Sequence, residues 1–463
     1  MGGCAVHQAG FDQPLETPEA FEAGREDPDA ERQPDEWWRA FGDERLDALQ
    51  DMAISENFDL ETFRDRLRAA RAVIDREESA LFPSVDYSLL GEQTRRQDDG
   101  FDAQDRFGGS LIGSYEVDVW ERNANIVRGA EFDRAIVRQR LDAAAISLSA
   151  DVALTWYALV EAWGQSRVLE EQIETNRSVL KVVRLRFAKG VVRLSDVLRQ
   201  EQLLESTREQ RAVVRGRIDR LEHALLVLTG RSPTGSLGDV ADELPGVPER
   251  PALGLPSDLM SRRPDIRSAM LAIRSADAQV AVAVADKYPS VTLGLNASTI
   301  EANIGDLFDD WAATLRVDVL GPIFDAGARE AEVERARAVK AERINAYAQT
   351  VLRAFEQVVN AVSNENAREE QITRLRRQLE LARRTSQRLN REYLNGDISY
   401  IDVLDALTNE QRLQRDLLSA RFERIGDRIA LYRALAGGWE GIDRPRSASD
   451  NNDPRHDQDA KDS

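Results

Sequence analysis

Apolar residues recur at every third or fourth position over two long stretches of the chain, residues 122–188 and 326–394. The apolar series are Leu141, Ala145, Leu148, Val152, Trp156, Leu159 and Trp163 in the first stretch, and Ile344, Tyr347, Val351, Ala354, Val358 and Val362 in the second. This spacing predicts two long helices, each with a coiled-coil-like seam. At 1.5 Å per residue, a helix of about 70 residues is roughly 100 Å long.

A glycine phrase ends each predicted long helix, and a shorter helical pattern follows it. The phrases are KGVVRLSDVL (189–198) and NGDISYIDVL (395–404), and the shorter helices are expected at about 195–229 and 399–435. Each pair of helices therefore forms an antiparallel hairpin with the phrase at its tip. A turn glycine followed by a capping residue such as Ser195 is also ordinary punctuation of a helical hairpin. The apolar stripe is too long for one hairpin to cover, so the hairpins need neighbours.

Four shorter segments alternate apolar and polar residues. They are SVDYSLLGEQ (84–93), SLIGSYEVDVW (110–120), SVTLGLNAST (290–299) and ATLRVDVLG (313–321). Alternation with a period of two predicts half-exposed strands. About ten residues is also the length of a tilted strand that crosses a bilayer in a β-barrel. Alternation alone leaves open whether these strands span a membrane or form soluble hairpins.

The chain also repeats itself at long range. The matched features are Gly190 with Gly396, Asp196 with Asp402 and Pro83 with Pro289 at a shift of 206 positions, EVDVW (116–120) with RVDVL (316–320) at 200, and LLVLTG (225–230) with YRALAG (432–437) at 207. Landmarks in the same order predict a duplication, not a solenoid of short units. The expected organisation is an acidic tether (1–36), two structural repeats (37–243 and 244–442) and a disordered tail (443–463).

Composition narrows the function. The 463-residue chain is 31% charged with a net charge of −20, which argues against nucleic acid as a partner. No run of about 18 apolar residues suggests a membrane-spanning helix. The single cysteine, Cys4, and three scattered histidines predict no disulfide, no metal cluster, no cofactor and no enzymatic activity.

Four strands are too few to close a barrel, and an open sheet edge is not tolerated in lipid. If the strands span a membrane, several chains must share one barrel. Two chains would supply eight strands and three would supply twelve, the latter with room for an open lumen.

Five segments carry a family resemblance. They are LPSDLMSRRPDIRSA (255–269), KYPSVTL (287–293), LGPIFDAGAR (320–329), GDISYIDVLDA (396–406) and LYRALAGGW (431–439). On these segments the chain, from about Trp37 to Trp439, resembles the TolC-like outer membrane factor family, in particular the NodT/OprM-type efflux lipoproteins of tripartite RND-type pumps.

The resemblance implies a mostly α protein with β, in which long coiled-coil hairpins and four strands per chain form a homotrimer. Its 12-stranded membrane β-barrel would lie in outer membrane lipid above an α-helical periplasmic barrel. The expected function is a passive exit duct for drugs or other small molecules, coupled by a periplasmic adaptor (membrane fusion protein) to an inner-membrane pump. A type I protein secretion channel and a soluble periplasmic coiled-coil scaffold are the alternatives.

The resemblance also assigns the two hairpin tips. Gly190, Val191, Gly396 and Asp397 would dock the adaptor.

The second tip would also carry the periplasmic gate, with Asp405 as its carboxylate and Ile401, one turn earlier, as its apolar ring. Three Asp405 side chains around a narrow axis would repel one another and attract cations. Leu407 and Thr408 stand where many members carry Gln and Arg, which puts a latching salt bridge in doubt. A solvated acid on a helix face is the plainer interpretation of Asp405.

Two further features have structural or anchoring interpretations. In LPSDLMSRRPDIR, Ser257 is expected to cap a helix, Pro264 to open the next, and Arg262 and Arg263 to hold neighbouring chain ends or solvent. Gly3-Cys4 matches the end of a lipoprotein processing site, although Met1-Gly2-Gly3 supplies no export signal. We therefore expect a lipidated, palmitate-bearing Cys4 whose leader is missing from this sequence; the alternative is a free thiol on a disordered tail.

Overall fold

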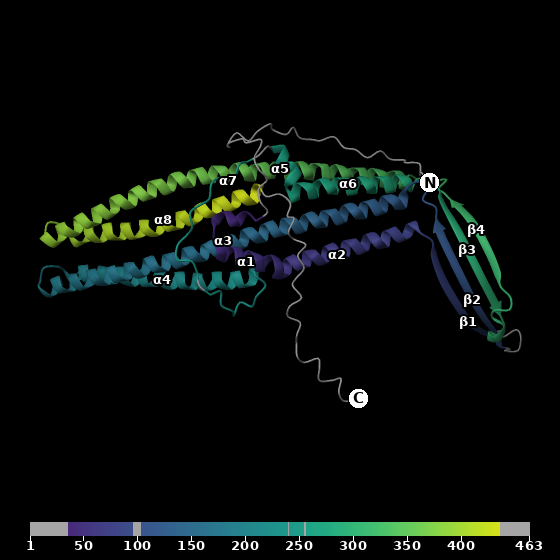
Figure 1. Ribbon diagram of the computed structural model, residues 1–463, viewed down its shortest axis with the longest axis horizontal. Helices are drawn as coiled ribbons and strands as arrows, with labels where there is room; N and C mark the ends of the chain where they lie inside the picture. Colours follow the sequence, from purple (N-terminus) through teal and green to yellow (C-terminus); the bar gives the residue numbers. More distant parts are fainter. Residues whose placement is uncertain (1–35, 96–102, 239, 254–255, 436–463) are drawn as a thin grey trace, which may run out of the picture. The chain divides into compact units, whose positions relative to one another are not determined.

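The computed structural model describes residues 36–95, 103–238, 240–253 and 256–435 (Figure 1). In chain order the elements are η1 (Trp37–Phe41), α1 (Glu44–Glu56), α2 (Phe58–Glu78), η2 (Ser79–Leu81), β1 (Ser84–Arg95), β2 (Ala103–Glu116), α3 (Arg122–Ala188), α4 (Leu194–Leu228), α5 (Pro256–Arg262), α6 (Pro264–Ala285), β3 (Ser290–Glu301), η4 (Ile304–Asp306), β4 (Ala312–Leu320), α7 (Ala328–Asn395) and α8 (Tyr400–Leu435). The prediction of a mostly helical chain with four strands is confirmed.

The described residues fall into two compact units. The first contains 63–141, apart from the undescribed 96–102, together with 264–352; the second contains the rest of the helical hairpins. Each unit takes segments from both halves of the chain, so the units cut across the two repeats seen in the sequence.

The first unit holds one antiparallel sheet in the order β1-β2-β3-β4. Its register places Tyr87 opposite Leu111, Gly113 opposite Leu295, and Leu293 opposite Val317. Because side chains alternate along each strand, this register collects most of the large apolar residues on one face. The large ones on that face, all exposed, are Val85, Tyr87, Leu89, Leu111, Leu293, Leu295, Leu315, Val317 and Val319.

The opposite face of the sheet is mostly polar, with Ser88, Ser110, Asn296 and Thr314 among its strand residues. Its large apolar residues are Leu90, Ile112, Ile300 and Leu320. Two ion pairs also lie on this face. One joins Glu92 to Arg106 at 3.9 Å, and the other joins Arg316 to Asp318 at 3.1 Å. A sheet with one continuous apolar face and one polar face suits lipid on one side and water on the other. A soluble hairpin would not leave so large an apolar face exposed.

The second strand ends earlier than its pattern suggests. The alternation predicts strand to residue 120, but β2 ends at Glu116, so the prediction is wrong for 117–120. The Val117 N–H still donates to the Val291 carbonyl at 2.9 Å, but the chain then turns at residues 119–120, where the Val119 N–H donates to the Val117 carbonyl at 2.8 Å. Trp120 then stacks on Tyr288 with ring centroids 4.6 Å apart, and its indole N–H donates to the Pro289 carbonyl at 2.7 Å.

A carboxylate caps the start of each long helix. Asp118 accepts the N–H groups of Asn123 and Ala124 at 3.1 and 2.8 Å. Asp325 accepts those of Gly327 and Arg329 at 3.0 and 3.3 Å. The functional counterpart of Asp118 is therefore Asp325, whereas the sequence match pairs it with Asp318, which lies within β4.

The hairpins formed by α3 with α4 and by α7 with α8 lie mostly in the second unit, which takes α3 from Asp142 and α7 from Arg353. Their bounds lie within two residues of the predicted ones. The predicted seam is buried along α3 except at Trp163, which is exposed. An apolar cluster joins α7 to α8 through Ile372, Leu379, Ala382, Leu413, Leu417 and Ala420.

Equivalent hydrogen bonds hold the C-terminal ends of the two return helices, α4 and α8. The Asn57 side-chain amide donates to the Leu228 carbonyl at 3.0 Å, and the Arg263 guanidinium donates to the Ala434 carbonyl at 3.0 Å. Donors and acceptors are both 206 positions apart. Arg263 thus holds a helix end as predicted, and Pro264 opens α6 as predicted. Ser257 is the second residue of α5, so its assignment as the cap was wrong.

Within the described chain, α3 and α6 are long and apolar enough in composition to cross a membrane, although the sequence suggested no such helix. This is weak evidence for a transmembrane helix, because core helices meet the same criterion. In α3, 61% of the apolar window is buried inside the structure.

Candidate functional site at the hairpin tips

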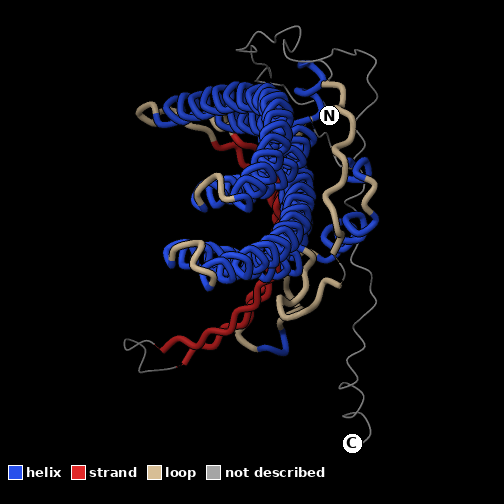
Figure 2. Tube along the Cα trace, turned by 90° about the vertical axis from the view of Figure 1, so that its left-hand side faces the viewer, coloured by secondary structure: helices blue, strands red, loops and turns tan. Residues whose placement is uncertain are grey.

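The hairpins end in short loops, drawn in tan in Figure 2. Both hairpin tips turn through a left-handed glycine. Gly190 has φ of 72° and Gly396 has φ of 93°, values that disfavour any residue with a Cβ. At the first tip, Gly190 N–H donates to the Phe187 carbonyl at 2.8 Å, and Val191 N–H donates to that of Arg186 at 2.9 Å. This pair of bonds is a Schellman motif, which ends a helix by satisfying its last carbonyls.

The second tip repeats this motif with the same spacing. Gly396 N–H donates to the Tyr393 carbonyl at 3.1 Å, and Asp397 N–H donates to that of Glu392 at 3.0 Å. The tips expose the four residues expected to dock an adaptor: Gly190, Val191, Gly396 and Asp397. Val191 brings an apolar side chain to the surface of the first tip and Asp397 a charged one to the second.

The start of each return helix is held by an aspartate. Asp196 accepts the Arg193 N–H at 3.2 Å, and the Ser399 hydroxyl donates to Asp402 at 2.8 Å. Ser195 lies inside the first turn of α4. Its assignment as the capping residue was therefore wrong, because the side chain that closes this turn belongs to its neighbour.

The two tips share one apolar core. It consists of Ile173, Leu180, Val183, Val197, Leu204, Tyr393, Tyr400 and Val403. The rings of Tyr393 and Tyr400 lie 5.4 Å apart, and the Arg186 guanidinium lies 4.5 Å from the centre of the Tyr393 ring. The first and second tips are therefore packed against each other, not only alike.

A buried polar contact crosses between the tips at Tyr400. Its hydroxyl donates to the side-chain carbonyl of Gln200, whose amide donates to the Asn176 carbonyl at 2.9 Å. Tyr400 is 3% exposed and Gln200 is 0% exposed. Burial raises the pKa of the Tyr400 phenol well above its usual range, so the hydroxyl keeps its proton.

Polar side chains continue from Asn176 along α3, where they face α8. We call this set, Glu161, Gln165, Gln172 and Asn176, the polar ladder. The side-chain carbonyl oxygen of Asn176 accepts from the Gln411 side-chain amide at 2.9 Å. The side-chain amides of Gln172 and Gln165 donate to the backbone carbonyls of Gln411 and Arg415, each at 3.0 Å. All four ladder residues are buried, and their spacing of four, seven and four positions keeps them on one face of the helix.

The predicted gate residues lie on the exposed side of α8. Ile401 is 38% exposed, and Asp405, one turn further, is also exposed. Among the described residues the Asp405 carboxylate makes neither a hydrogen bond nor an ion pair. Leu407 points into the structure, and the Thr408 hydroxyl donates to the Leu404 carbonyl of its own helix at 2.8 Å. Neither neighbour supplies a latch for Asp405 within the described chain.

The lipid-anchor prediction at Cys4 lies outside the described residues.

Comparison with known proteins identifies the family. The model of the outer membrane efflux protein family matches residues 49–231 and again residues 255–437. The chain belongs to the outer membrane efflux proteins. The two matched stretches begin 206 positions apart, the same shift that relates the two tips.

Relatives of this efflux protein align with it over most of its length. The pyoverdine export outer membrane protein OpmQ of Pseudomonas aeruginosa is 29% identical, with 95% of each chain covered. The cation efflux system protein CusC of Escherichia coli is 27% identical over 87% of this chain and 88% of that protein. The solved outer-membrane channel OprN is 26% identical, with a TM-score of 0.84 over 93% of this chain and 99% of that chain. The protein is a channel subunit of an efflux system in the outer membrane.

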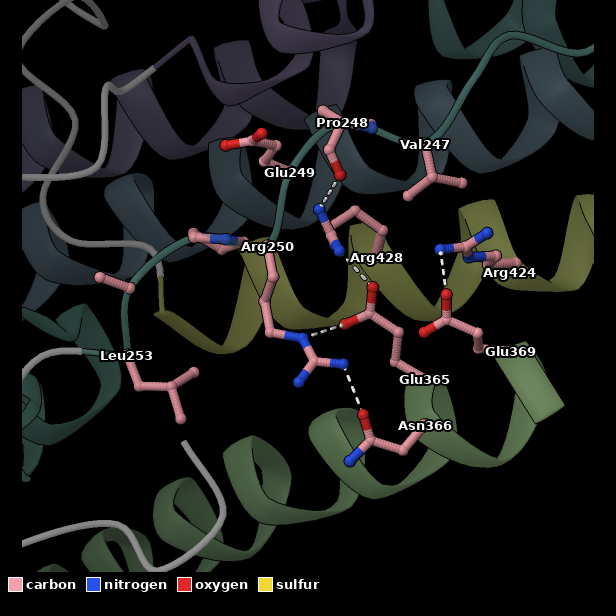
Figure 3. Close-up of a pocket in the computed structure, with 12 residues that line it drawn as sticks. Val247, Pro248, Glu249, Arg250, Leu253, Glu365, Asn366, Glu369, Arg424 and Arg428 are labelled. Carbon is pink, nitrogen blue, oxygen red and sulfur yellow. Dashed lines mark hydrogen bonds and ion pairs between the residues drawn. The ribbon is translucent and has the colours of Figure 1, made fainter. Parts of the chain in front are cut away.

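One pocket of this efflux protein has a structural role. A pocket of about 1120 Å³ lies where the segment 247–253 crosses α7 and α8 (Figure 3). Glu365 is buried there between Arg428, with which it forms an ion pair, and Arg250 at 2.9 Å. Arg424 pairs with Glu369 at 3.4 Å. These ion pairs fasten the crossing segment to α7 and α8, and the exposed Glu249 is a carboxylate of the lining that has no partner among the described residues.

Proposed function

We propose that three copies of this chain form one exit duct, a twelve-stranded barrel in the outer membrane above a tube of helical hairpins. The observation that carries the proposal is the sheet, with one apolar face, one polar face, and β1 and β4 at its edges. In lipid those edges must pair, and neighbouring copies are the simplest partners. Three copies give a lumen, whereas two give a barrel whose interior side chains fill.

The test is the size of the detergent-solubilised particle. A trimer has a protein mass three times that of the 51.9 kDa chain and a substantial β signal by circular dichroism. A chain that stays monomeric and soluble without detergent would support the periplasmic scaffold alternative instead.

The duct is passive, catalyses no reaction and carries small solutes. Relatives are named for pyoverdine export and for cation efflux, which favours small molecules or ions over proteins as cargo. A deletion strain that keeps its drug tolerance but fails to secrete a protein would reverse this preference in favour of type I secretion.

Adaptor docking is assigned to the two tips. Gly190 and Val191 at the first tip, and Gly396 and Asp397 at the second, are exposed at the ends of hairpins held rigid by a shared core. A periplasmic adaptor bound there would connect the duct to an inner-membrane pump. Replacing Val191 by Asp should abolish co-purification of the adaptor while leaving the particle mass unchanged.

The gate is assigned to Asp405 and Ile401. An exposed carboxylate with no partner in the described chain is available to line an axis shared with other copies, where like charges repel and cations gather. Asp405→Ala should raise single-channel conductance in planar bilayers. Asp416→Ala is the matched control, because Asp416 is also on α8 but pairs with Arg412 at 2.6 Å. Equal conductance of the two variants would end the gate assignment.

The N-terminal segment 1–36 would serve as a tether, lipidated at Cys4. Mass spectrometry of the native protein extracted from membranes decides this assignment. An unmodified Cys4 thiol would refute it.

A further inference from the structure

The edge strands β1 and β4 must pair across copies if the proposed trimer is correct, and the chain itself contains a template for that pairing. Within the sheet, β1–β2 and β3–β4 are equivalent hairpins. Ser84 lies opposite Ser114, and Ser290 lies opposite Leu320, so both members are shifted by 206 positions. The same shift relates the tips and the helix joints.

The pairing of β2 with β3 joins the end of one repeat to the start of the next. In a ring of copies, the pairing of β4 with β1 of the next copy is the same kind of junction. Ser114 lies opposite Gly294 in the first junction. Leu320 lies 206 positions after Ser114, and Ser88 lies 206 positions before Gly294.

We propose that β4 of one copy pairs with β1 of the next in this register, with Leu320 opposite Ser88 and Arg316 opposite Glu92. The proposal rests on the trimer proposed above and adds the residues that each copy contributes to this junction. We call the junction of β4 with β1 of the next copy the strand seam.

The register keeps both faces of the sheet continuous. Val319 comes opposite Leu89 on the apolar face, whereas a shift by one residue would set apolar side chains on the polar face. A shift by two residues in either direction loses the pairing of Arg316 with Glu92 and is disfavoured. One direction places Arg316 opposite Leu90, and the other places Asp318 opposite Glu92, where like charges destabilise the pair.

The charges form an alternating row in the proposed register. Arg106 faces Glu92 within one copy at 3.9 Å, and Arg316 lies 3.1 Å from Asp318 in the other. Setting Glu92 opposite Arg316 joins the two pairs into the sequence Arg, Glu, Arg, Asp along the polar face. Both of these strand-seam side chains are exposed in the single chain and free to meet.

Exposed apolar residues mark the strand seam at the end of β4. At the internal junction, Trp120 after β2 covers Tyr288 before β3. The equivalent of Tyr288 is Phe82, which is 68% exposed before β1. Ile323 is fully exposed and Phe324 is 89% exposed just after β4. In the proposed pairing these two residues reach the next copy's Phe82 and cover it as Trp120 covers Tyr288.

Cysteine pairs can test the register. Val117 N–H donates to Val291 at the internal junction, so the odd-numbered pairs of the strand seam are hydrogen-bonded and the pair of Leu320 with Ser88 is not. Non-hydrogen-bonded pairs bring Cα atoms to about 4.5 Å, within the range of a disulfide. We would compare Leu320→Cys combined with Ser88→Cys, with Asp86→Cys or with Leu90→Cys, in the full chain oxidised in membranes.

The first combination should give covalent dimers and trimers on non-reducing gels, at least about tenfold more than either shifted combination. Variants with only one added cysteine measure how much crosslinking occurs through Cys4. A three-chain particle that crosslinks best through position 86 or 90 overturns the register and leaves the trimer intact. A one-chain particle without crosslinks overturns the trimer as well.

Discussion

Removing one oxygen atom, in Tyr400→Phe, tests whether the tips are locked together by the polar contact between them. The hydroxyl donates to Gln200, and both side chains are almost wholly buried. Phenylalanine keeps the ring in the apolar core but leaves the Gln200 carbonyl oxygen without this donor. A buried group left unpaired costs about 1–3 kcal/mol. Since about 1.4 kcal/mol is a tenfold change, local opening of the α8 tip should increase roughly 5- to 140-fold.

Amide hydrogen exchange of residues 400–407 in the detergent-solubilised protein measures this opening. Tyr393→Phe is the control, because Tyr393 lies in the same apolar core and its hydroxyl has no hydrogen-bond partner among the described residues. The control should leave the protection of residues 400–407 unchanged. If both variants lose protection equally, or if Tyr400→Phe loses none, the polar contact does not hold the tip and the reasoning is wrong.

Three further changes test other parts of the structure. Gly396→Ala should lower the thermal unfolding midpoint, because a left-handed residue with a Cβ costs about 1–2 kcal/mol. The control Gly216→Ala lies inside α4 and should raise the midpoint. A higher midpoint for both variants would contradict the tip geometry. Arg428→Ala removes the buried partner of the Glu365 carboxylate and leaves it only the partly exposed Arg250, so it should cost less than the roughly 3–5 kcal/mol of a buried charge left wholly unpaired, measured by urea unfolding. The double variant with Arg250→Ala should reach that range, and an equal loss in both variants would contradict the shared ion pair. Backbone N–H bonds from Gly327 and Arg329 lower the pKa of Asp325, so its stabilisation is complete above the ordinary carboxyl pKa of about 4 and is lost as pH falls further. Asp325→Asn should therefore flatten the acid limb of a stability-against-pH curve, and an unchanged limb would refute the cap.

The helices and strands were predictable because their signals are local and long. The two hairpins repeat a period of three to four over dozens of residues, and no tertiary contact is needed to see that pattern. The prediction was wrong where two local structures look alike. Val117 still bonds to Val291 after β2 ends, and the chain then turns at residues 119–120, but the alternation of apolar and polar residues continues through the turn.

The details of the tips were only partly predictable. Gly190 and Gly396 could be assigned because left-handed turns select glycine. The polar ladder could not, since Gln172 and Asn176 look like solvated helix-face residues until α8 is placed against them. Their partners lie more than 230 positions away in the sequence. The one available signal was the seam spacing of these polar residues along a helix whose other seam positions are apolar.

The polar ladder has a mechanical consequence for α8. An apolar interface tolerates sliding, because one methyl group replaces another with little loss. A ladder that pairs side-chain amides with specific carbonyls does not. Moving α8 lengthwise by one turn, about 5.4 Å, would separate Gln165 and Gln172 from their acceptors at the same time. The ladder therefore resists axial slip of α8 along α3 more than it resists sideways movement of the helix about this line of bonds.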